Sequence, residues 1–301
     1  METPQTITLG SVTVTRVEEM HGPVMPADQF FPDMPEEAWK EYRETLVPDH
    51  LGADDNMVVA AMQTWVLRSG GRTILVDTAI GNDKVRPAVA AWDHLRLDYL
   101  GNLARAGVRP ADVDLVVNSH LHTDHIGWNT QLADGAWVPT FPNATYLMPR
   151  VDFEYWNPAN NPGIAGGVNE NAFEDSVAPV LDAGQVKLWE GSHVIDESLR
   201  MEAAPGHTPG HSVIVLESGT DRALFAADIM HTPLQVPRPD HSSCFCLDPA
   251  LANATRRRLL GWAADNNALV LPAHLGGHSA LEVQHQGSNF TITKWAPFTR
   301  S

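Results

Sequence analysis

The chain has 301 residues, of which 43% are hydrophobic, so it can bury a sizeable core and is not expected to be disordered. Its formal net charge of -17 argues against nucleic acid and anionic membranes as partners, because phosphate-rich surfaces bind basic faces. No run approaches the ~20 apolar residues of a membrane span, and METPQTITLG lacks the basic and apolar regions of a secretory signal, so we expect a cytoplasmic protein.

The N-terminal part predicts strands on both sides of a proline-rich segment. Residues 5–19 alternate in polarity and are rich in β-branched residues, which predicts a strand or hairpin. Residues 20–55 are dense in proline and aspartate and predict an N-terminal extension over the core, with one short helix from Pro35 to Leu46. Residues 57–82 predict two strands joined at Ser69-Gly70-Gly71.

The rest of the chain alternates between helical and strand patterns. Residues 94–107 predict an amphipathic helix, and residues 150–190, rich in asparagine, proline and glycine, predict an irregular loop near the site. The runs VDLVV and ALFAA are apolar on both faces, so we expect a mixed α/β fold in which helices or a second sheet cover these strands. Strands are predicted at 112–119, 199–204, 211–218, 222–228 and 268–273, with a helix from Pro249 to Asn266 before the last of them.

Ligand-type side chains directly follow four of the predicted strands. Side chains at strand ends are held by a rigid sheet yet stay accessible at its edge. A single histidine would be an ordinary core or surface residue, but four ligand-type residues within HLHTDH would desolvate one another without gain unless they bind cations. The residues are His120, His122, Asp124 and His125 after 112–119, His207 after 199–204, Asp228 after 222–228, and His274 after 268–273.

The spacing within HLHTDH suits two adjacent cations. In extended chain His120 and His122 point to the same side and can bind one cation. A turn at Thr123 directs Asp124 and His125 toward a second cation. Borderline cations such as zinc favour imidazole nitrogen with some carboxylate, and a carboxylate is the natural bridge between two of them.

HLHTDH resembles the HxHxDH signature of the metallo-β-lactamase-fold hydrolases, and PGHTPGH, FAAD and LPAH follow in the order of that superfamily's later motifs. The resemblance runs from ILVDT to PAHLGGH and covers nearly the whole chain. It implies one domain over residues 1–301, built as a four-layer αββα sandwich with two mixed sheets face to face, helices outside and metals at one sheet edge.

The resemblance also implies the role of each ligand, and two divalent metal ions per chain. The ligand types suit zinc, with manganese, iron and cobalt as alternatives. Asp77, in ILVDT, matches a family aspartate that orients a ligand imidazole, the alternative being a simple turn carboxylate. The first metal is assigned to His120, His122 and His207, the second to Asp124, His125 and His274, with Asp228 as the bridge.

From such a pair of metal ions we expect a hydrolytic reaction. Two adjacent cations lower the pKa of a shared water, so a bridging hydroxide is expected to attack a carbonyl carbon or a phosphorus centre. Asp124 or Asp228 is expected to take the proton. Acyl-homoserine lactonases often have a tyrosine three residues after the bridging aspartate, where this chain has His231; it is expected either to donate to the leaving group or to pack beside the site.

HIGWN, the long N-terminal extension and DIMHTPLQV are similar to the lactonase and methyl parathion hydrolase branch, which implies a lactone, a carboxylic ester or a phosphotriester as substrate. A glyoxalase-type thioesterase and a catalytically silent metal-binding scaffold are the alternatives. The first usually has cationic residues for an anionic thiol carrier, and no such cluster is found in the sequence; the second is not supported by any missing ligand.

Three further features bear on partners. A small neutral or apolar substrate fits aromatic residues in or beside irregular segments, the alternative being that they are ordinary core. Relatives often pair through the extension, so a homodimer through FFPDMPEEAW is expected. Cys244 and Cys246 are too close to bridge, and they form either part of a strand or half of a soft metal site. The aromatic residues are Phe30, Phe31, Trp128, Phe153 and Trp156.

Overall fold

Two seven-stranded sheets form the centre of the molecule in the computed structural model, which describes residues 6–164 and 166–296. In the first sheet, β1 to β4 pair antiparallel and β4, β5, β8 and β9 pair parallel, so the sheet is mixed. Its strands, in spatial order, are β1 (Thr6–Leu9), β2 (Val12–Pro26), β3 (Met57–Ser69), β4 (Arg72–Val76), β5 (Leu115–Val117), β8 (Thr145–Pro149) and β9 (Val186–Trp189).

The second sheet contains the C-terminal strands and is antiparallel except where β13 and β14 run parallel. A separate two-stranded hairpin consists of β6 (Thr130–Ala133) and β7 (Ala136–Pro139). In spatial order the second sheet contains β10 (Ser192–Val194), β11 (Leu199–Ala203), β12 (Ser212–Ser218), β13 (Asp221–Ala227), β14 (Leu269–Pro272), β15 (Leu281–Gln286) and β16 (Asn289–Trp295).

An apolar layer between the two sheets holds them face to face. Trp65 and Leu67 of β3 point into this layer, where they meet side chains such as Ile214 and Phe225 of the second sheet. Val66, between them in the sequence, points to the opposite face and packs against the helices outside. Strand β3 is therefore buried on both faces, which explains its nearly continuous apolar sequence.

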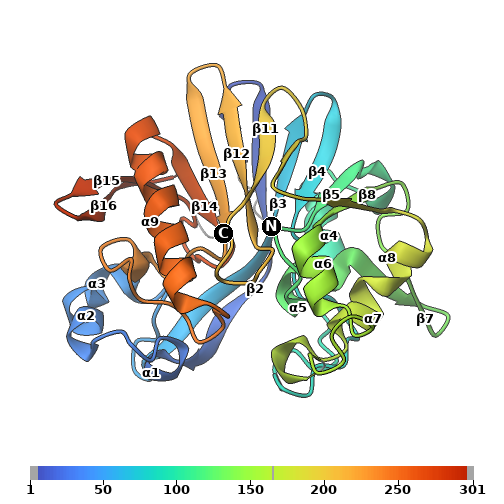
Figure 1. Ribbon diagram of the computed structural model, residues 1–301, viewed down its shortest axis with the longest axis horizontal. Coiled ribbons are helices and arrows are strands. Elements are labelled where there is room, and N and C mark those ends of the chain that lie inside the picture. The colour runs from blue at the N-terminus through green and yellow to red at the C-terminus, as the bar shows by residue number, and fades with distance from the viewer. Residues whose placement is uncertain (1–5, 165, 297–301) are drawn as a thin grey trace.

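The long helix α9 (Pro249–Asn266) covers the outer face of the second sheet. It has the predicted bounds because both ends carry caps: Asp248 accepts a hydrogen bond from the backbone N–H of Leu251 at 2.9 Å, Pro249 occupies the first turn, and Asn267 ends the helix in the left-handed region. Its buried Leu259, Leu260 and Ala263 belong to the apolar cluster on that face. In Figure 1, α9 lies between β13 on its right and β15 and β16 on its left.

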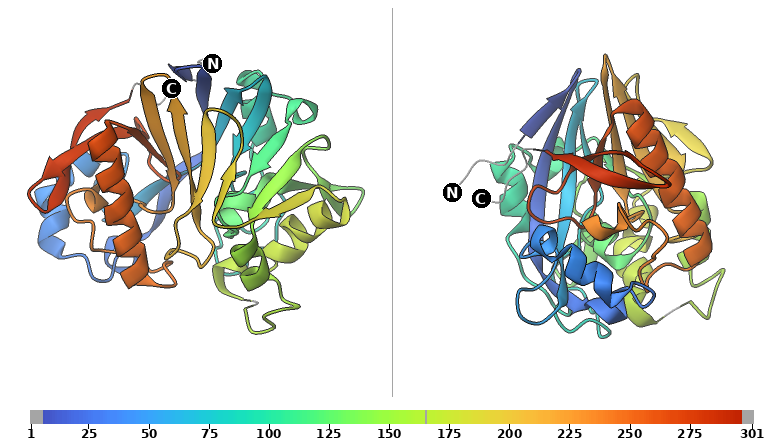
Figure 2. Two further views of the ribbon diagram at one scale, coloured as in Figure 1. Left: turned by 45° about the horizontal axis from the view of Figure 1, so that its top comes forward. Right: turned by 90° about the vertical axis from the view of Figure 1, so that its left-hand side faces the viewer.

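Shorter helices cover the outer face of the first sheet, on the right in Figure 1. Together with α9 they make four layers, αββα, and the right-hand view of Figure 2 shows α9 and the blue and cyan strands on opposite sides. The predicted fold class is therefore confirmed. The helices near the first sheet are α4 (Tyr99–Arg105), α5 (Thr123–Ile126), α6 (Arg150–Trp156), α7 (Ala172–Ser176) and α8 (Ala178–Asp182).

The prediction of an irregular loop over residues 150–190 is wrong in large part. Helices α6, α7 and α8 and strand β9 all lie within it. These helices have only five to seven residues each, so propensity alone cannot stabilise them. Burial of Phe153, Val177 and Val180 against the first sheet stabilises them instead, and such tertiary contacts leave no local pattern.

The extension at residues 20–55 also differs from its prediction. Residues 20–26 continue strand β2, and residue 5 lies outside the described range. The single predicted helix is two short helices, α2 (Glu36–Glu41) and α3 (Arg43–Leu46), separated at Tyr42, after a one-turn helix α1 (Ala27–Phe30). Apolar residues of these turns pack with one another and with Leu234, the middle residue of η4 (Pro233–Gln235).

Several strands end at one edge of the sandwich. Strands β11, β13 and β14 run in the same direction, so their carboxyl ends meet there, and β5 ends close by in the first sheet. Backbone contact across the two sheets is direct, because the N–H of Ser212 donates to the carbonyl of Ser119 at 2.9 Å. Within the described residues, no helix is long and apolar enough to cross a membrane.

We expect Phe225→Ala to lower the free energy of unfolding by about 3–5 kcal/mol, because it opens a cavity between the sheets. Phe225 is 1% exposed and its ring lies 6.3 Å from that of Trp65. Urea denaturation measures the effect, and Leu132→Ala, at a side chain 46% exposed, is the control with a change within about 0.5 kcal/mol. Equal effects of the two substitutions would contradict this account of the core.

Candidate metal centre

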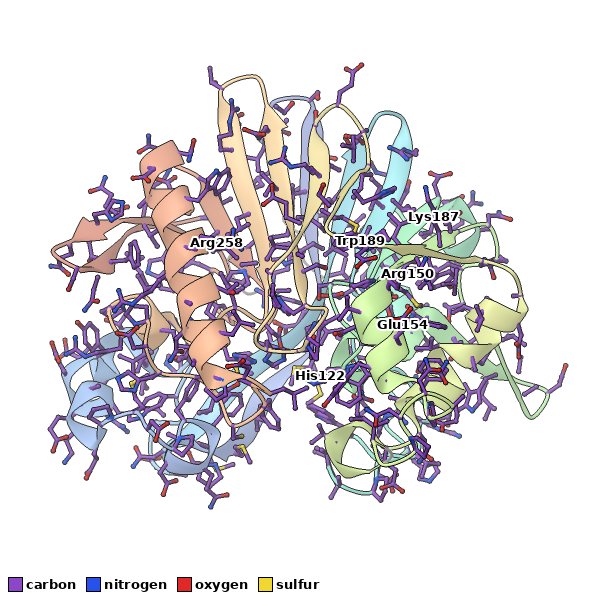
Figure 3. The ribbon with its side chains drawn as sticks, viewed as in Figure 1. His122, Arg150, Glu154, Lys187, Trp189 and Arg258 are labelled. Carbon is purple, nitrogen blue, oxygen red and sulfur yellow. The ribbon has the colours of Figure 1, made fainter. Side chains whose placement is uncertain are left out.

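The loops at this sheet edge bring four ligating atoms together in a first group. His120 and His122 follow β5, and their Nε2 and Nδ1 atoms lie 3.1 Å apart. The Nε2 of His207, from the loop after β11, lies 2.9 Å from His122 Nδ1 and 3.2 Å from Asp228 Oδ2. All four ligating atoms lie within 4.8 Å of one another. Figure 3 shows His122 at this edge, below Arg150 and Glu154 of α6.

A second group adjoins the first and shares Asp228 with it. Asp228 Oδ1 lies 3.3 Å from His125 Nε2 and 3.1 Å from His274 Nε2. Asp124, at the start of α5, lies 3.6 Å from His274 and 3.9 Å from His125. Asp228 therefore faces the first group with Oδ2 and the second group with Oδ1. The structure brings together all seven side chains that the sequence predicts as ligands.

The unsatisfied atoms of the site fit bound cations. His125 Nε2 and Asp228 Oδ1 are buried and have no hydrogen-bond partner among the described residues. A buried polar atom without a partner costs free energy, and a cation between these atoms would satisfy both of them. Imidazole nitrogens and carboxylate oxygens form the donor set that zinc prefers.

A second set of contacts orients the imidazoles. Asp77 Oδ2 accepts from His125 Nδ1–H at 2.9 Å and from the hydroxyl of Ser119 at 2.8 Å, and Oδ1 accepts from the Ser119 N–H at 2.7 Å. Since Ser119 uses its proton on Asp77, its oxygen accepts from His120 Nδ1–H at 3.0 Å. His274 Nδ1–H donates to the carbonyl of Ala61 at 3.0 Å. Each of these contacts occupies Nδ1, so Nε2 is the nitrogen that is directed at the groups and available to a cation.

Two buried residues that the sequence did not single out support the ligands. Asp152 of α6 accepts from the Leu121 N–H, from the Gly210 N–H and from the Thr208 hydroxyl, at 3.0, 2.6 and 2.9 Å. It thereby joins the loop of the first sheet that carries His120 and His122 to the loop of the second sheet that carries His207. His211 Nε2 accepts the backbone N–H of Asp228 at 3.0 Å, which places that carboxylate.

The direction of the pKa shift divides the histidines of the site into two classes, one with a lowered pKa and one with a raised pKa. Burial and neighbouring imidazoles lower the pKa of His120 and His122 well below the ordinary value, so their rings are neutral. Burial opposes protonation of His207 as well, but Asp228 raises its pKa to about 9. Burial would raise the pKa of Asp228, yet the surrounding histidines lower it well below its usual range. Cations binding here would replace the protons that these carboxylate contacts retain.

His231 lies inside the site. Its Nε2 is 3.2 Å from Asp228 Oδ2, and its ring stacks on that of His274 with centroids 5.5 Å apart. It forms a third cluster of ligating atoms with these two residues, which the sequence did not predict. Burial lowers the pKa of His231 to about 4, so the imidazole is neutral.

A pocket of about 190 Å³ opens onto the two groups. Of the five aromatic residues predicted for its wall, only Phe30 lines it. Trp128 is ordinary core, as the alternative expected, since it stacks on Tyr99 and donates to Glu19. Phe31, Phe153 and Trp156 do not line the pocket, although the ring of Trp156 packs against that of His122 and the ring of Phe31 against that of His231. The apolar lining residues are Val24, Met25, Phe30, Ala60, Met62, Ala88, Val89, Trp92, Val168 and Phe245.

Neither prediction for the two cysteines holds. Both lie in the loop before α9 and not in a strand. Cys244 is exposed whereas Cys246 is buried, so their sulfurs do not form half of one metal site. Cys246 instead lies with its sulfur 3.5 Å from His207 Nδ1.

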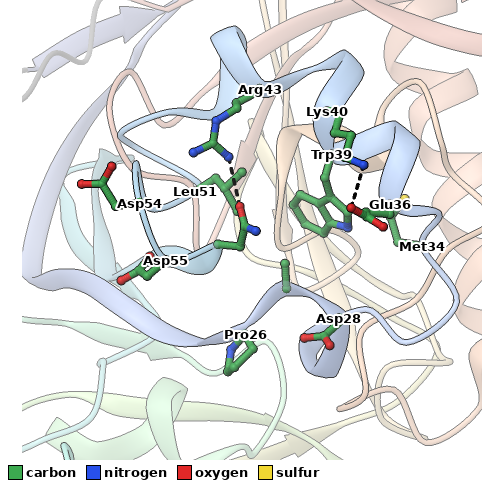
Figure 4. Close-up of a pocket in the computed structure, with 12 residues that line it drawn as sticks. Pro26, Asp28, Met34, Glu36, Trp39, Lys40, Arg43, Leu51, Asp54 and Asp55 are labelled. Carbon is green, nitrogen blue, oxygen red and sulfur yellow. Dashed lines mark hydrogen bonds and ion pairs between the residues drawn. The ribbon is translucent and has the colours of Figure 1, made fainter.

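Another cavity, of about 710 Å³, lies in the extension and contains none of the candidate ligands. Figure 4 shows Trp39 and Leu51 among its walls, with Lys40 paired to Glu36 at 2.7 Å. Arg43 donates to the side-chain oxygen of Asn56 at 3.0 Å. Both cations of this cavity already have partners within it.

The sandwich fold and the His/Asp groups at its edge define a metal-binding α/β protein. The sequence of residues 62–274 matches the family model of the metallo-beta-lactamase superfamily. The chain belongs to this superfamily, and the family prediction from the sequence is confirmed.

Individual relatives and structures agree with this assignment. An N-acyl homoserine lactonase of a Bacillus species is 28% identical over 169 residues, which is 51% of this chain and 57% of the relative, so the chain spans about half the length of the curated relatives it matches. The hydrolase AbOPH of the beta-lactamase superfamily has a TM-score of 0.79 at 21% identity and covers 100% and 99% of the two chains. The dizinc quorum-quenching lactonase AidC has a TM-score of 0.73 at 20% identity, with 97% of each chain covered.

We expect Asp77→Asn to weaken zinc binding about 10- to 100-fold, because the amide cannot accept from both Ser119 and His125 as the carboxylate does. Asparagine also tolerates the left-handed backbone at this position, where φ is 57°. Competition with a chelator measures the dissociation constant. Asp134→Asn, at an exposed left-handed turn residue, is the matched control, and an equal constant for both variants would contradict the orienting role of Asp77.

Proposed function

We propose that the protein is a dinuclear metal-dependent hydrolase of a compact, neutral lactone, carboxylic ester or phosphotriester. The observation that carries this proposal is the position of Asp228, whose two carboxylate oxygens face two adjacent groups of ligating atoms. Both groups lie at the bottom of a pocket with apolar walls.

The two cations would be held by side chains from both sheets, and zinc fits the donor set. When bound, such cations lower the pKa of a shared water and polarise the oxygen of the group under attack. The first cation would be held by His120, His122 and His207, and the second by Asp124, His125 and His274. Asp228 would serve both.

Asp124 is the residue best placed to take the proton from the attacking water. It lines the pocket, its side chain is 14% exposed, and its nearest charged contacts are the histidines at 3.6 and 3.9 Å. Asp228, by contrast, is 3% exposed and has histidines against both oxygens, so we assign it to holding the cations. The proton would pass to a carboxylate oxygen of Asp124.

His231 is proposed to donate to the leaving oxygen. It lines the pocket and is fixed by contact with Asp228 and by stacking on His274. A neutral imidazole N–H can donate a hydrogen bond there, which would stabilise negative charge as the bond to the leaving group breaks.

The pocket supports the proposed substrate class. Its volume of about 190 Å³ is below the 300–1,000 Å³ of typical ligand pockets, so a compact substrate fits. Among the described residues that line it there is no lysine or arginine to receive an anionic thiol carrier, which disfavours the thioesterase alternative. The curated relatives named as N-acyl homoserine lactonases support a lactone within this class.

A hydrolysis panel on the zinc-loaded protein tests the proposal, with acyl-homoserine lactones, simple lactones, aryl esters, phosphotriesters and thioesters. We expect about two zinc ions per chain and turnover of a lactone, ester or phosphotriester. Turnover of thioesters alone would favour the thioesterase alternative. Full metal binding without turnover of any substrate would favour the catalytically silent scaffold.

Within this panel, Asp228→Ala should reduce zinc content and lower kcat/KM on the order of 10³-fold or more, because one side chain serves both cations. Elemental analysis and circular dichroism separate loss of metal from loss of fold. Asp182→Ala, at an exposed carboxylate at the end of α8, is the control that should leave both quantities unchanged. Unaltered turnover in Asp228→Ala would overturn the proposed mechanism.

Trp92 closes one side of the pocket and is 8% exposed, so Trp92→Ala should admit longer substrates. The ratio of kcat/KM for a long acyl chain over a short one is expected to rise about 10-fold, as for one or two added methylene contacts. Trp262→Ala, which removes an indole from α9 instead, should leave the ratio unchanged. A ratio that does not change in Trp92→Ala would show that another wall limits the substrate.

A further inference from the structure

The segment before α9 is fixed against the loop that carries His207. The backbone N–H of Leu247 donates to the carbonyl of His207, and that of Asp248 donates to the carbonyl of Gly206, both at 2.9 Å. The N–H of Cys246 donates to the carbonyl of Ser243 at 3.1 Å and closes a turn. These bonds hold the Cys246 side chain, which is 8% exposed, with its sulfur 3.5 Å from His207 Nδ1.

His207 requires a hydrogen-bond acceptor beside its Nδ1 atom. Its Nε2 faces Asp228 Oδ2 at 3.2 Å and His122 Nδ1 at 2.9 Å, within the first group of ligating atoms. An imidazole binds a cation only through a nitrogen without a proton, so the proton must stay on Nδ1. The Nδ1 atom contacts an oxygen acceptor in three other histidines, namely His120, His125 and His274. In His207 the Nδ1 atom contacts sulfur instead.

We propose that Cys246 is a positioning residue of the metal centre: its sulfur accepts the hydrogen bond from His207 Nδ1–H and thereby keeps Nε2 free and directed at the first cation. This inference rests on the proposed function, because it assumes that His207 is a ligand. It also assigns a role to a buried thiol that neither touches substrate nor lines the pocket. The exposed Cys244, two residues earlier, has no contact of this kind with a ligand among the described residues.

Three variants test the proposal, namely Cys246→Ala, Cys246→Ser and the matched control Cys244→Ala. Chelator competition gives the dissociation constant for zinc, and circular dichroism gives the fold. We expect Cys246→Ala to raise the dissociation constant of the zinc in the group that contains His207 about 10- to 100-fold, as removal of such an acceptor does at other metal sites. Cys246→Ser should recover part of this loss, because its hydroxyl oxygen can also accept, and Cys244→Ala should not change the constant.

A second readout separates positioning from mere packing. Proton–nitrogen correlation spectra of the zinc-loaded protein report which ring nitrogen of each histidine carries a proton. We expect His207 to carry it on Nδ1 in the unmodified protein and in Cys246→Ser, and to lose this single form in Cys246→Ala. An unchanged dissociation constant and an unchanged His207 spectrum in folded Cys246→Ala would overturn the inference.

Other outcomes show whether this inference or the proposed function has failed. If Cys246→Ala does not fold, the Cys246→Ser variant tests the inference. Zinc binding and a His207 spectrum like those of the unmodified protein would support it. Loss of the Nδ1–H form of His207, despite the serine hydroxyl, would overturn it. If the unmodified protein binds no zinc, the proposed metal centre itself fails and this inference fails with it. Zinc binding by the unmodified protein without turnover removes the proposed activity, and the Cys246 variants then still decide the role of Cys246.

Discussion

One carboxylate, that of Asp228, holds the arrangement of the site together. Its two oxygens face two groups of imidazoles, which come from both sheets. Backbone geometry fixes it: the strand before it has a register shift, Ala227 lies in the left-handed region with φ of 45°, and His211 accepts its N–H. A residue other than glycine in this region is strained by about 1–3 kcal/mol, a cost that the surrounding contacts must offset. The strain is therefore located where the chain must turn sharply from the sheet into the site.

The sequence predicted those parts of the protein whose causes are local. The strands before the ligands are short apolar runs, and α9 has its own caps, so both could be recognised without knowledge of the rest of the chain. The candidate ligands were recognisable because ligand-type residues crowd into HLHTDH and follow other strands directly. Asp77 was identified by its motif, and the structure places it against His125.

The remaining parts depend on contacts between distant segments. Hydrogen bonds to distant residues or to another loop connect Asp152, His211 and Cys246 to the site. The sequence pattern did not indicate these contacts, and for Cys246 it suggested a strand or a soft metal site instead. Phe245 and Trp92 line the pocket only because their loops meet there. The short helices of residues 150–182 and the division of the predicted helix at Tyr42 depend on packing as well, and propensity over a few residues is too weak to predict them.

Part of the pocket wall comes from loops that carry none of the candidate metal ligands, whereas Val24, Met25, Ala60 and Met62 come from β2 and β3. Phe30 comes from α1, Val89 and Trp92 from the loop after β4, and Phe245 from the loop before α9, whereas the ligands follow strands of the central sheets. Substitutions at these loop positions can therefore change the wall without replacing a candidate ligand. Such a separation lets a lineage reshape the pocket by drift and selection in its loops, with the candidate ligands inherited unchanged.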